Sequence, residues 1–346
     1  MSQRRLRVSV PGDIKGLVRS RHHVVSQGFM RFFADGKRVL LCDKTEPTSG
    51  WQVRLAGTSD VFVRDHFNSY REQGKWVDRL EDDWQPLETR ALTPIRSWIR
   101  GTEILEPNGA SLPSREETKV LAAIHFARSY GYRDSHERIA LEVFQDAIKT
   151  LPSNVELIEL WRRQYGADPT PRQVEAMISE RFTDDFGATG PNVIQSMRRT
   201  YNLVLEKLIP LHVQALHAPP VPSVTFVLGD TPFVYYAANE LKVGGRMGLA
   251  LGEADRWLLP LSPHLAVMFS TSKMPDQELD IAGVQKINNL TWRAAQSQII
   301  CHPRTDFRNA IAGRPLAEAK ASPEVPMPGS QFKRDTREPR SDAQHT

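Results

Sequence analysis

The chain of 346 residues is 40% hydrophobic and 25% charged, the composition of an ordinary globular protein with room for one large domain or two. It has no apolar run near the roughly 20 residues that span a bilayer and no apolar signal-peptide core, so we expect a cytoplasmic protein without membrane contact. The formal net charge of +4 is too small by itself to indicate a nucleic-acid partner. Only two cysteines occur, far apart at Cys42 and Cys301, which predicts buried free thiols rather than a disulfide framework.

The N-terminal part of the chain is basic. Residues 1–18 predict an arm with one short strand over 6–10. From Arg4 to Arg38 basic side chains greatly outnumber acidic ones. Such clustering would attract an anionic partner, and it is equally typical of a solvated basic edge.

The segment 19–44 is the part around which the rest of the prediction is organised. Its sequence predicts a basic, His-rich helix followed by a turn and a buried strand over 38–44. On that helix His23, Gln27 and Arg31 recur at four-residue intervals, which places an imidazole, an amide and a guanidinium along one face. The sequence therefore predicts a polar stripe on an otherwise apolar helix.

The same segment carries a resemblance to a known family. Its pattern is formed by His23, Gln27, Arg31, Phe33 and Ala34. It resembles the opening motif of the mainly bacterial DUF4238 family, which usually reads His-Tyr-Val-Pro-Gln-Phe-Tyr-Leu-Arg-Asn-Phe-Ala here. This chain departs from it with Val24 at the tyrosine and Ser26 at the proline. The family has no established activity, so the resemblance implies a shared fold and candidate positions rather than a mechanism.

Later segments resemble the same family in the same order, and the resemblance covers roughly residues 19 to 305. These segments are 64–67, 226–232 and 259–263. The second of them usually reads Ser-Asp-Asn-Pro in the family, and this chain retains Asp230 and Pro232 of that motif. Asp230 thereby becomes a candidate site residue beside those of the opening motif.

The next part of the chain predicts a hairpin and then helices. A strand over 51–55 follows the strand over 38–44 after a short turn, which predicts a hairpin. A helix over 76–99 has an apolar face with two prolines, and the pattern from 114 to about 216 is helical throughout. Helix starts are predicted here at Ser114, Thr170 and Asn192.

After a proline-rich linker the period becomes extended, with a further helix predicted only over 280–297. The predicted strands cover 223–228, 232–237, 256–261, 265–270 and 298–302. Because the N-terminal hairpin is too small to be stable alone, we expect it to pair with these strands. The sequence thus predicts an α+β fold, with a mixed, largely antiparallel sheet formed by the N- and C-terminal regions and a central helical bundle inserted into it. The expected organisation is an N-terminal arm at 1–18, a helix and hairpin at 19–75, a helical region at 76–217, C-terminal strands of the same sheet at 223–312, and a disordered tail at 313–346.

The sequence lacks the motifs of well-known cofactor and metal sites. It has no P-loop, no Gly-x-Gly-x-x-Gly, no His-Glu-x-x-His, no Cys-x-x-Cys and no Gly-x-Ser-x-Gly. We therefore expect no cofactor and no metal site. A dedicated ATPase, zinc enzyme or dehydrogenase is disfavoured for the same reason.

His23 is the strongest acid–base candidate, because an imidazole has an ordinary pKa near neutrality. Gln27 would position a ligand, and Arg31 would bind phosphate through its planar guanidinium. The alternative is structural: His23 and Gln27 satisfy buried backbone groups, and Arg31 pairs with Asp43 or Asp65.

Two carboxylates complete the candidate site. Asp230 follows an apolar strand in a tight turn, where it can orient a histidine or bind a metal; the structural alternative is that it accepts backbone hydrogen bonds in its own turn. If it lies beside His23, a His–Asp pair with Arg31 becomes the leading site. Asp65 is a weaker candidate for ligand binding.

These residues lead to two hypotheses. The first is an enzyme that acts on a phosphate-containing ligand, a metal-independent nuclease-like effector in defence or toxin systems, with nucleic acid or a nucleotide as its partner. His23 is then the general acid or base, Arg31 the phosphate clamp, Gln27 a positioning group and Asp230 the orienting carboxylate. The second is a non-catalytic binding or regulatory protein that docks a partner on its helical bundle, with the polar stripe serving structure.

Overall fold

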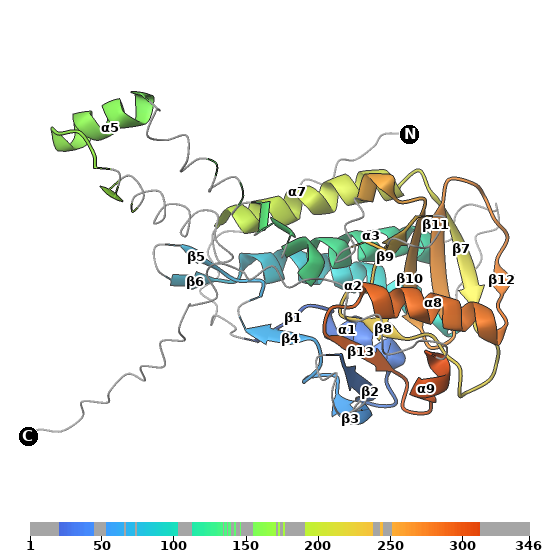
Figure 1. Ribbon diagram of the computed structural model, residues 1–346. Coiled ribbons are helices and arrows are strands. Elements are labelled where there is room, and N and C mark those ends of the chain that lie inside the picture. The colour runs from blue at the N-terminus through green and yellow to red at the C-terminus, as the bar shows by residue number, and fades with distance from the viewer. Residues whose placement is uncertain are drawn as a thin grey trace, which may run out of the picture. The chain divides into compact units, whose positions relative to one another are not determined.

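The computed structural model describes most of the chain between residues 21 and 311 (Figure 1). The described ranges are 21–44, 53–65, 67–72, 75–102, 113–133, 155–170, 191–237 and 251–311, with a few further positions between them. The predicted N-terminal arm and C-terminal tail lie outside these ranges. Within them the chain combines helices and sheets in an α+β fold, as the sequence predicted. None of the described helices is both long and apolar enough to cross a membrane.

The N-terminal hairpin belongs to a four-stranded antiparallel sheet. β2 (Arg38–Asp43) pairs with β3 (Val53–Gly57) on one side and with β13 (Gln298–Cys301) on the other. β13 also pairs with β8 (Leu228–Gly229). Strands from both ends of the chain thus complete one sheet, which confirms that the hairpin pairs with later strands.

A second sheet forms without the hairpin, so the prediction of a single sheet is wrong. Its order is β12 (Gln277–Glu278), β7 (His212–His217), β11 (Leu265–Ser270), β10 (Arg256–Ser262) and β9 (Val234–Tyr236). Only β12 and β7 run parallel, so the sheet is mixed. Because β11 pairs with β7 on one side and β10 on the other, the middle of this sheet has no place for the hairpin.

β7 also corrects the predicted end of a helix. The helix predicted over 192–216 is α7 (Pro191–Leu208), and the strand begins soon after Pro210. Proline has no N–H to continue a helical ladder. All residues of β7 are in register with β11. Pairing with β11 therefore makes a strand of residues whose sequence pattern predicted the end of a helix.

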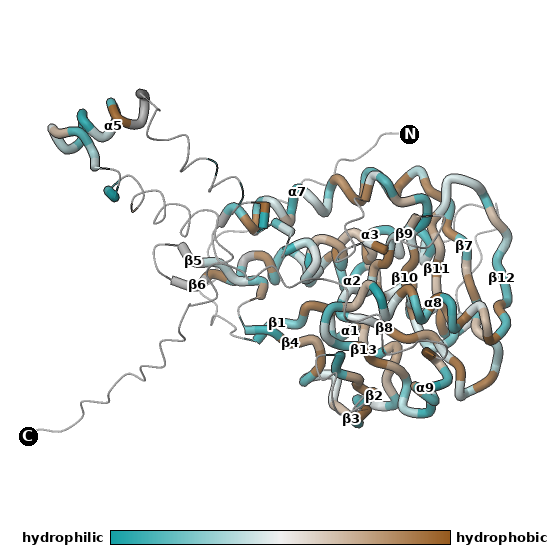
Figure 2. Tube along the Cα trace, in the orientation of Figure 1, coloured by the Kyte–Doolittle hydropathy of each residue, from teal (hydrophilic) through white to brown (hydrophobic). Residues whose placement is uncertain are grey.

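Helices α2 (Arg79–Ile99), α3 (Pro113–Ala127) and α7 pack together, with α3 in contact with both of the others (Figure 1). α2 continues through both of its prolines. α3 begins at Pro113, so Ser114 lies buried in its first turn instead of capping it. Apolar and polar positions alternate along α7 in Figure 2, as an amphipathic helix requires.

Helix α8 (Ile281–Ala294) confirms the helix predicted over 280–297, and side chains hold both of its ends. Asp280 accepts the Gly283 N–H at 2.7 Å at the start. Lys44 donates to carbonyl oxygens of Trp292 and Ala295 at the end. The remaining described elements outside the candidate site are α5 (Val155–Tyr165), η3 (Leu251–Glu253), α9 (Phe307–Ala310), β5 (Tyr70–Glu72) and β6 (Lys75–Val77).

A large apolar cluster connects the helices α2, α3 and α7 with both larger sheets. A smaller cluster lies at β2 and β13 and contains Cys42 and Cys301. Both thiols are buried and free, as predicted. The core therefore joins strands from both ends of the described chain with the helices between them.

Candidate functional site

The segment that carries the family motif begins with a strand instead of the predicted helix. β1 (Arg21–His23) pairs antiparallel with β4 (Val63–Asp65). Because His23 lies in a strand, it does not share a helical face with Gln27 and Arg31. The predicted polar stripe is wrong in this respect.

The helical part of the segment starts at Gln27, four residues after His23. α1 (Gln27–Met30) begins after Ser26, whose hydroxyl accepts a backbone N–H of the first turn and caps it, and η1 (Arg31–Phe33) follows directly. Arg31 Nη2 donates to Gln27 Oε1 at 3.0 Å on the protein surface. These two residues are therefore side by side, as predicted, because four residues make about one helical turn.

The ring of His23 is held in one orientation by the backbone. Its Nδ1 lies 3.1 Å from the Val61 carbonyl oxygen. A carbonyl oxygen can only accept, so Nδ1 carries the proton and Nε2 of the neutral ring has a free lone pair. Nε2 has no hydrogen-bond partner in the part of the chain that the structure describes. The ring can therefore accept a proton from a ligand.

Burial lowers the pKa of His23 below its ordinary value, and the hydrogen bond to Val61 opposes this effect. The positive charge of Arg128 lowers the pKa further, whereas Glu81 raises it. The net effect leaves the imidazole neutral at pH 7. A neutral ring with a fixed tautomer is the form that a general base needs.

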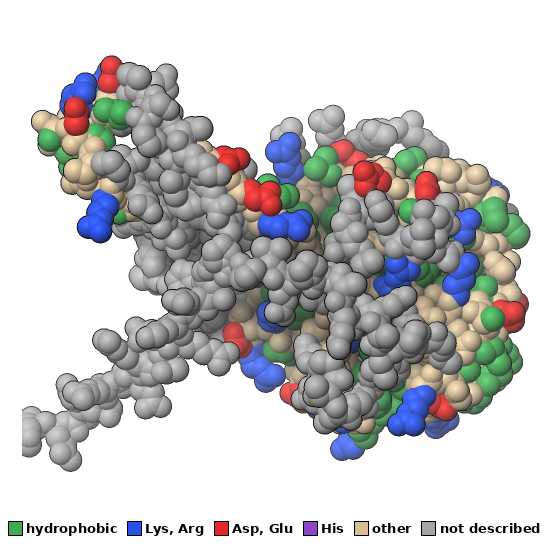
Figure 3. Space-filling view, viewed as in Figure 1, with side chains coloured by type: hydrophobic (Ala, Val, Ile, Leu, Met, Phe, Trp, Pro, Cys, Tyr) green, Lys and Arg blue, Asp and Glu red, His purple; other side chains and the backbone are tan. Residues whose placement is uncertain are grey.

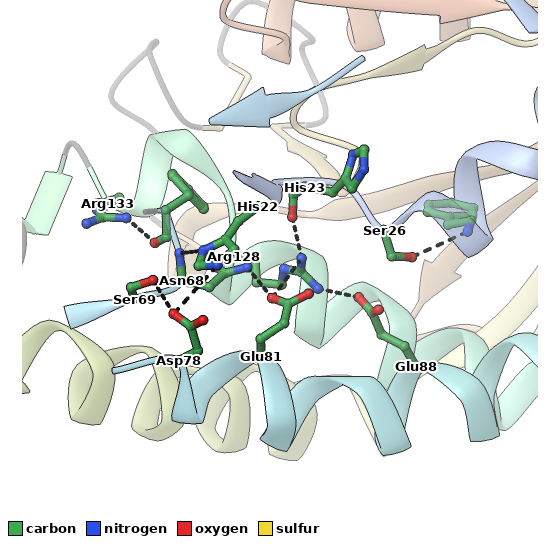
Figure 4. Close-up of polar contacts among 12 residues, drawn as sticks. His22, His23, Ser26, Asn68, Ser69, Asp78, Glu81, Glu88, Arg128 and Arg133 are labelled. Atoms are coloured by element: carbon green, nitrogen blue, oxygen red, sulfur yellow. Dashed lines mark hydrogen bonds and ion pairs between the residues drawn. The ribbon is translucent and has the colours of Figure 1, made fainter. Parts of the chain in front are cut away.

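The backbone of His23 is held from the opposite side by a buried arginine. Figure 4 shows the ring of His23 on one side and its carbonyl oxygen pointing toward Arg128 of the segment after α3. Arg128 Nη2 donates to that oxygen, and Nη1 donates to Glu88 Oε1 of α2 at 2.5 Å. Glu81 Oε2 lies 3.7 Å from Nη2. Arg128 thus ties the strand to α2.

Burial raises the pKa of Glu88 to about 7, against the lowering effect of Arg128. The nearby Glu81 raises it further, and a hydrogen bond from Ser26 lowers it. Burial thus moves the titration of this carboxyl group from acidic toward neutral pH. This cluster is a charged structural anchor behind the strand that carries His23.

His22 belongs to the same anchor and faces away from the ring of His23, since neighbouring strand residues point to opposite sides. Its Nδ1 accepts the Asn68 N–H at 2.8 Å, and its Nε2 lies 3.7 Å from Asp78 Oδ1. Asn68 Nδ2 donates to Glu81 Oε2 at 2.5 Å. The two histidines therefore do not share a ligand, and among the described residues no group of three metal-ligating side chains occurs.

The alternative partners that the sequence suggested for Arg31 are elsewhere. Asp43 lies 3.8 Å from Arg54 and accepts a hydrogen bond from Gln298 Nε2 at 2.8 Å. Asp65 ends β4 and is exposed, in register with Arg21. Neither carboxylate forms an ion pair with Arg31 in the described ranges.

Asp230 is buried, and its carboxylate binds the loop between α8 and β13. Oδ1 accepts the Gln296 N–H at 2.7 Å, and Oδ2 accepts the Ser297 N–H at 2.7 Å, the Ser297 hydroxyl at 2.7 Å and the Gln298 N–H at 3.0 Å. It binds neither its own turn nor the ring of His23. It is nevertheless linked to that ring, because Gln298 Oε1 accepts the N–H of the residue after Val61.

Sequence reasoning missed the charged anchor formed by Glu81, Glu88 and Arg128. A signal for it exists: Glu88 lies four residues after Trp84 and Arg128 four residues after Ile124, both on apolar helix faces. Charged residues on such faces are buried only with a partner. Two of them on separate helices predict that the helices meet there.

Fold and site together define an α+β protein with a backbone-oriented, neutral histidine at the end of β1 and a surface Arg–Gln pair in the helical turns that follow it. The family model that matches residues 21–305 is DUF4238, described as a protein of unknown function. The chain belongs to this family, as its opening motif indicated. No curated protein and no solved structure matches the chain.

Proposed function

We propose that this protein acts on a phosphate-containing ligand as a metal-independent, nuclease-like hydrolase with His23 as its general base. The observation that supports this most is the oriented ring, in which Nδ1 is bound to Val61 and Nε2 is free. Nε2 would accept the proton of an attacking water or hydroxyl group, whose oxygen then bonds to phosphorus. The leaving oxygen takes its proton from solvent.

Arg31 is the proposed phosphate clamp. One of its N–H groups is used by Gln27, which fixes the guanidinium on the surface and leaves further donors for phosphate oxygens. Asp65 is a proposed acceptor for hydroxyl or amino groups of the ligand, since it lies exposed on the strand that pairs with β1. Asp230 acts on His23 only through Gln298, as a positioning residue.

The proposed ligand is a nucleic acid or a nucleotide, and the proposed role is that of an effector in a bacterial defence or toxin system. On the face shown in Figure 3 the described Lys and Arg side chains are scattered among acidic and apolar ones. The described part of this face thus shows no continuous basic surface of the kind that a long duplex needs, and a small phosphate ligand or a single strand is the proposed ligand instead.

The test is cleavage of end-labelled single-stranded RNA and DNA, in EDTA and separately in magnesium. His23→Ala should reduce the rate by roughly 100-fold or more, and Arg31→Ala should mainly weaken binding. His264→Ala is the matched control, because His264 is an exposed histidine in the turn between β10 and β11. The wild-type rate should already be maximal at pH 7, because the pKa of His23 is lowered and the ring must be neutral.

Two outcomes would count against the proposal. Cleavage that survives His23→Ala removes His23 as the base. If no substrate is cut in either buffer, the nuclease hypothesis is withdrawn, and the second hypothesis, a binding or regulatory protein, is tested by a search for bound partners.

A further inference from the structure

The turn that faces His23 has an unusual backbone conformation. Phe62 has a φ of 54°, in the left-handed region that residues with a Cβ rarely adopt. Its side chain is fully buried. Such a conformation persists only where neighbouring contacts hold it. The question is therefore what holds Phe62, and what its conformation achieves.

Two hydrogen bonds hold Phe62. Its N–H donates to Gln298 Oε1 at 3.0 Å, and its carbonyl oxygen accepts the Val24 N–H at 2.8 Å. The first bond comes from β13 and the second from the end of β1. The turn is thus fixed between a strand of the four-stranded sheet and the segment that carries His23.

The side-chain amide of Gln298 has only one possible orientation. Its Nε2 donates to Asp43 Oδ1 at 2.8 Å, and a carboxylate can only accept, so Oε1 must face the N–H of Phe62. The backbone N–H of Gln298 is bound by Asp230 at 3.0 Å. Gln298 is therefore fixed at both its backbone and its side chain.

One peptide group connects this amide to the histidine. The Val61–Phe62 peptide is trans, so its C=O and N–H lie in one plane and point in opposite directions. Its N–H binds Gln298, and its carbonyl oxygen faces Nδ1 of His23 at 3.1 Å. Holding the N–H at Gln298 therefore aims the carbonyl at the ring. The φ of Phe62 sets the rotation of this same peptide plane.

We propose that Gln298 is a positioning residue for His23, acting through the Val61–Phe62 peptide, and that Asp43 completes this relay; the catalytic part of the inference rests on the proposed function. The relay consists of the Asp43 carboxylate, the Gln298 amide, the peptide group and the imidazole. Its hydrogen bonds all run in one direction, so each polarises the next. It fixes the Nδ1–H tautomer and leaves Nε2 as the basic nitrogen.

The relay also stabilises the charged ring during a reaction. When Nε2 takes a proton from the attacking group, the positive charge spreads to Nδ1–H, and its bond to the Val61 oxygen strengthens. No proton moves along the relay. The negative end at Asp43 favours the imidazolium through two polarised amide groups, much as a direct carboxylate partner does at shorter range.

The test reads the tautomer and the titration of His23 by nitrogen-15 NMR of histidine-labelled, full-length protein without any ligand. Wild type should show a protonated Nδ1 and an unprotonated Nε2. Gln298→Leu removes both side-chain hydrogen bonds, and the Nδ1–H tautomer should be lost. Asp43→Asn keeps an acceptor for Gln298 Nε2 and removes only the negative charge, so the tautomer should remain while the pKa of His23 falls. Gln285→Leu is the matched control, because among the described residues the Gln285 side chain on α8 donates to the Asn309 carbonyl oxygen and has no contact with His23 or its turn.

If a folded Gln298→Leu variant keeps the wild-type tautomer, the relay does not exist. If that variant fails to fold, Asp43→Asn decides: an unchanged pKa of His23 equally overturns the proposal. Any turnover found should fall by roughly 10- to 100-fold in Gln298→Leu. Absence of turnover in the wild-type protein would overturn the proposed function but not the relay, because the NMR spectra test the relay independently of activity. If Gln298→Leu loses turnover while the tautomer of His23 is unchanged, the relay is overturned and the proposed function remains.

Discussion

Glu88 provides a direct test of the charged anchor behind the candidate site. Glu88→Gln keeps the shape of the side chain and an acceptor oxygen for Arg128 Nη1, and removes the titration. The pKa of Glu88 is raised from 4.5 to about 7 by burial. At about 1.4 kcal/mol for each pH unit, this difference corresponds to about 3 kcal/mol as an upper value.

The sign of the effect follows from the raised pKa. Between pH 4.5 and about 7 the folded protein holds a proton on Glu88 that the unfolded chain has released. Folding stability contributed by this group is therefore complete below pH 4.5 and is lost as pH rises to about 7. Glu88→Gln has no such loss. Relative to wild type, the variant should gain up to about 3 kcal/mol between pH 5 and pH 8.

Urea unfolding of wild type and Glu88→Gln at several pH values measures the difference between their free energies of unfolding. All other titrating groups cancel in that difference. Glu278→Gln, at an exposed glutamate on β12, is the matched control for the same substitution outside the core. A flat difference for Glu88→Gln would refute the reasoning. A difference of opposite slope would show that the ion pair with Arg128 outweighs burial.

Two further predictions concern the buried groups near β13. Asp230→Asn places an amide where Oδ2 accepts three hydrogen bonds, so the free energy of unfolding should fall by about 3 kcal/mol, measured by urea unfolding; a change below 0.5 kcal/mol would contradict this anchoring role. Burial raises the pKa values of Cys42 and Cys301 to about 12, so neither thiol should react with a disulfide reagent at pH 8 until the protein unfolds; rapid labelling of the native protein would disprove their burial.

The strand at His23 shows where local pattern and tertiary structure differ. The spacing of His23, Gln27 and Arg31 fits a helix, yet Ser26 caps a helix that starts only at Gln27. Val24 and Val25, which follow β1 directly, disfavour a helix running back through His23, and β4 supplies the pairing partner of β1. A serine at the N-cap position of α1 can be predicted from the sequence. The pairing of β1 with β4, about forty residues away in the chain, cannot.

The sequence by itself determined the α+β class, the family, the pairing of the hairpin with later strands, and the buried free thiols. The class, the family and the thiols depend on composition, motif and local period, and the pairing follows because an isolated hairpin is too small to be stable. It also identified His23 as the acid–base candidate and Gln27 and Arg31 as neighbours, since the last two are one helical turn apart.

Only the tertiary structure decided how the candidate site is held. Arg128 from the turn after α3 and Glu88 from α2 meet behind His23, and Gln298 reaches the turn at Phe62 from a strand more than 200 residues away in the chain. Each of these contacts depends on the orientation of one side chain across an interface between elements. A helical or strand period specifies which face a residue lies on, but not which residue of another element it meets.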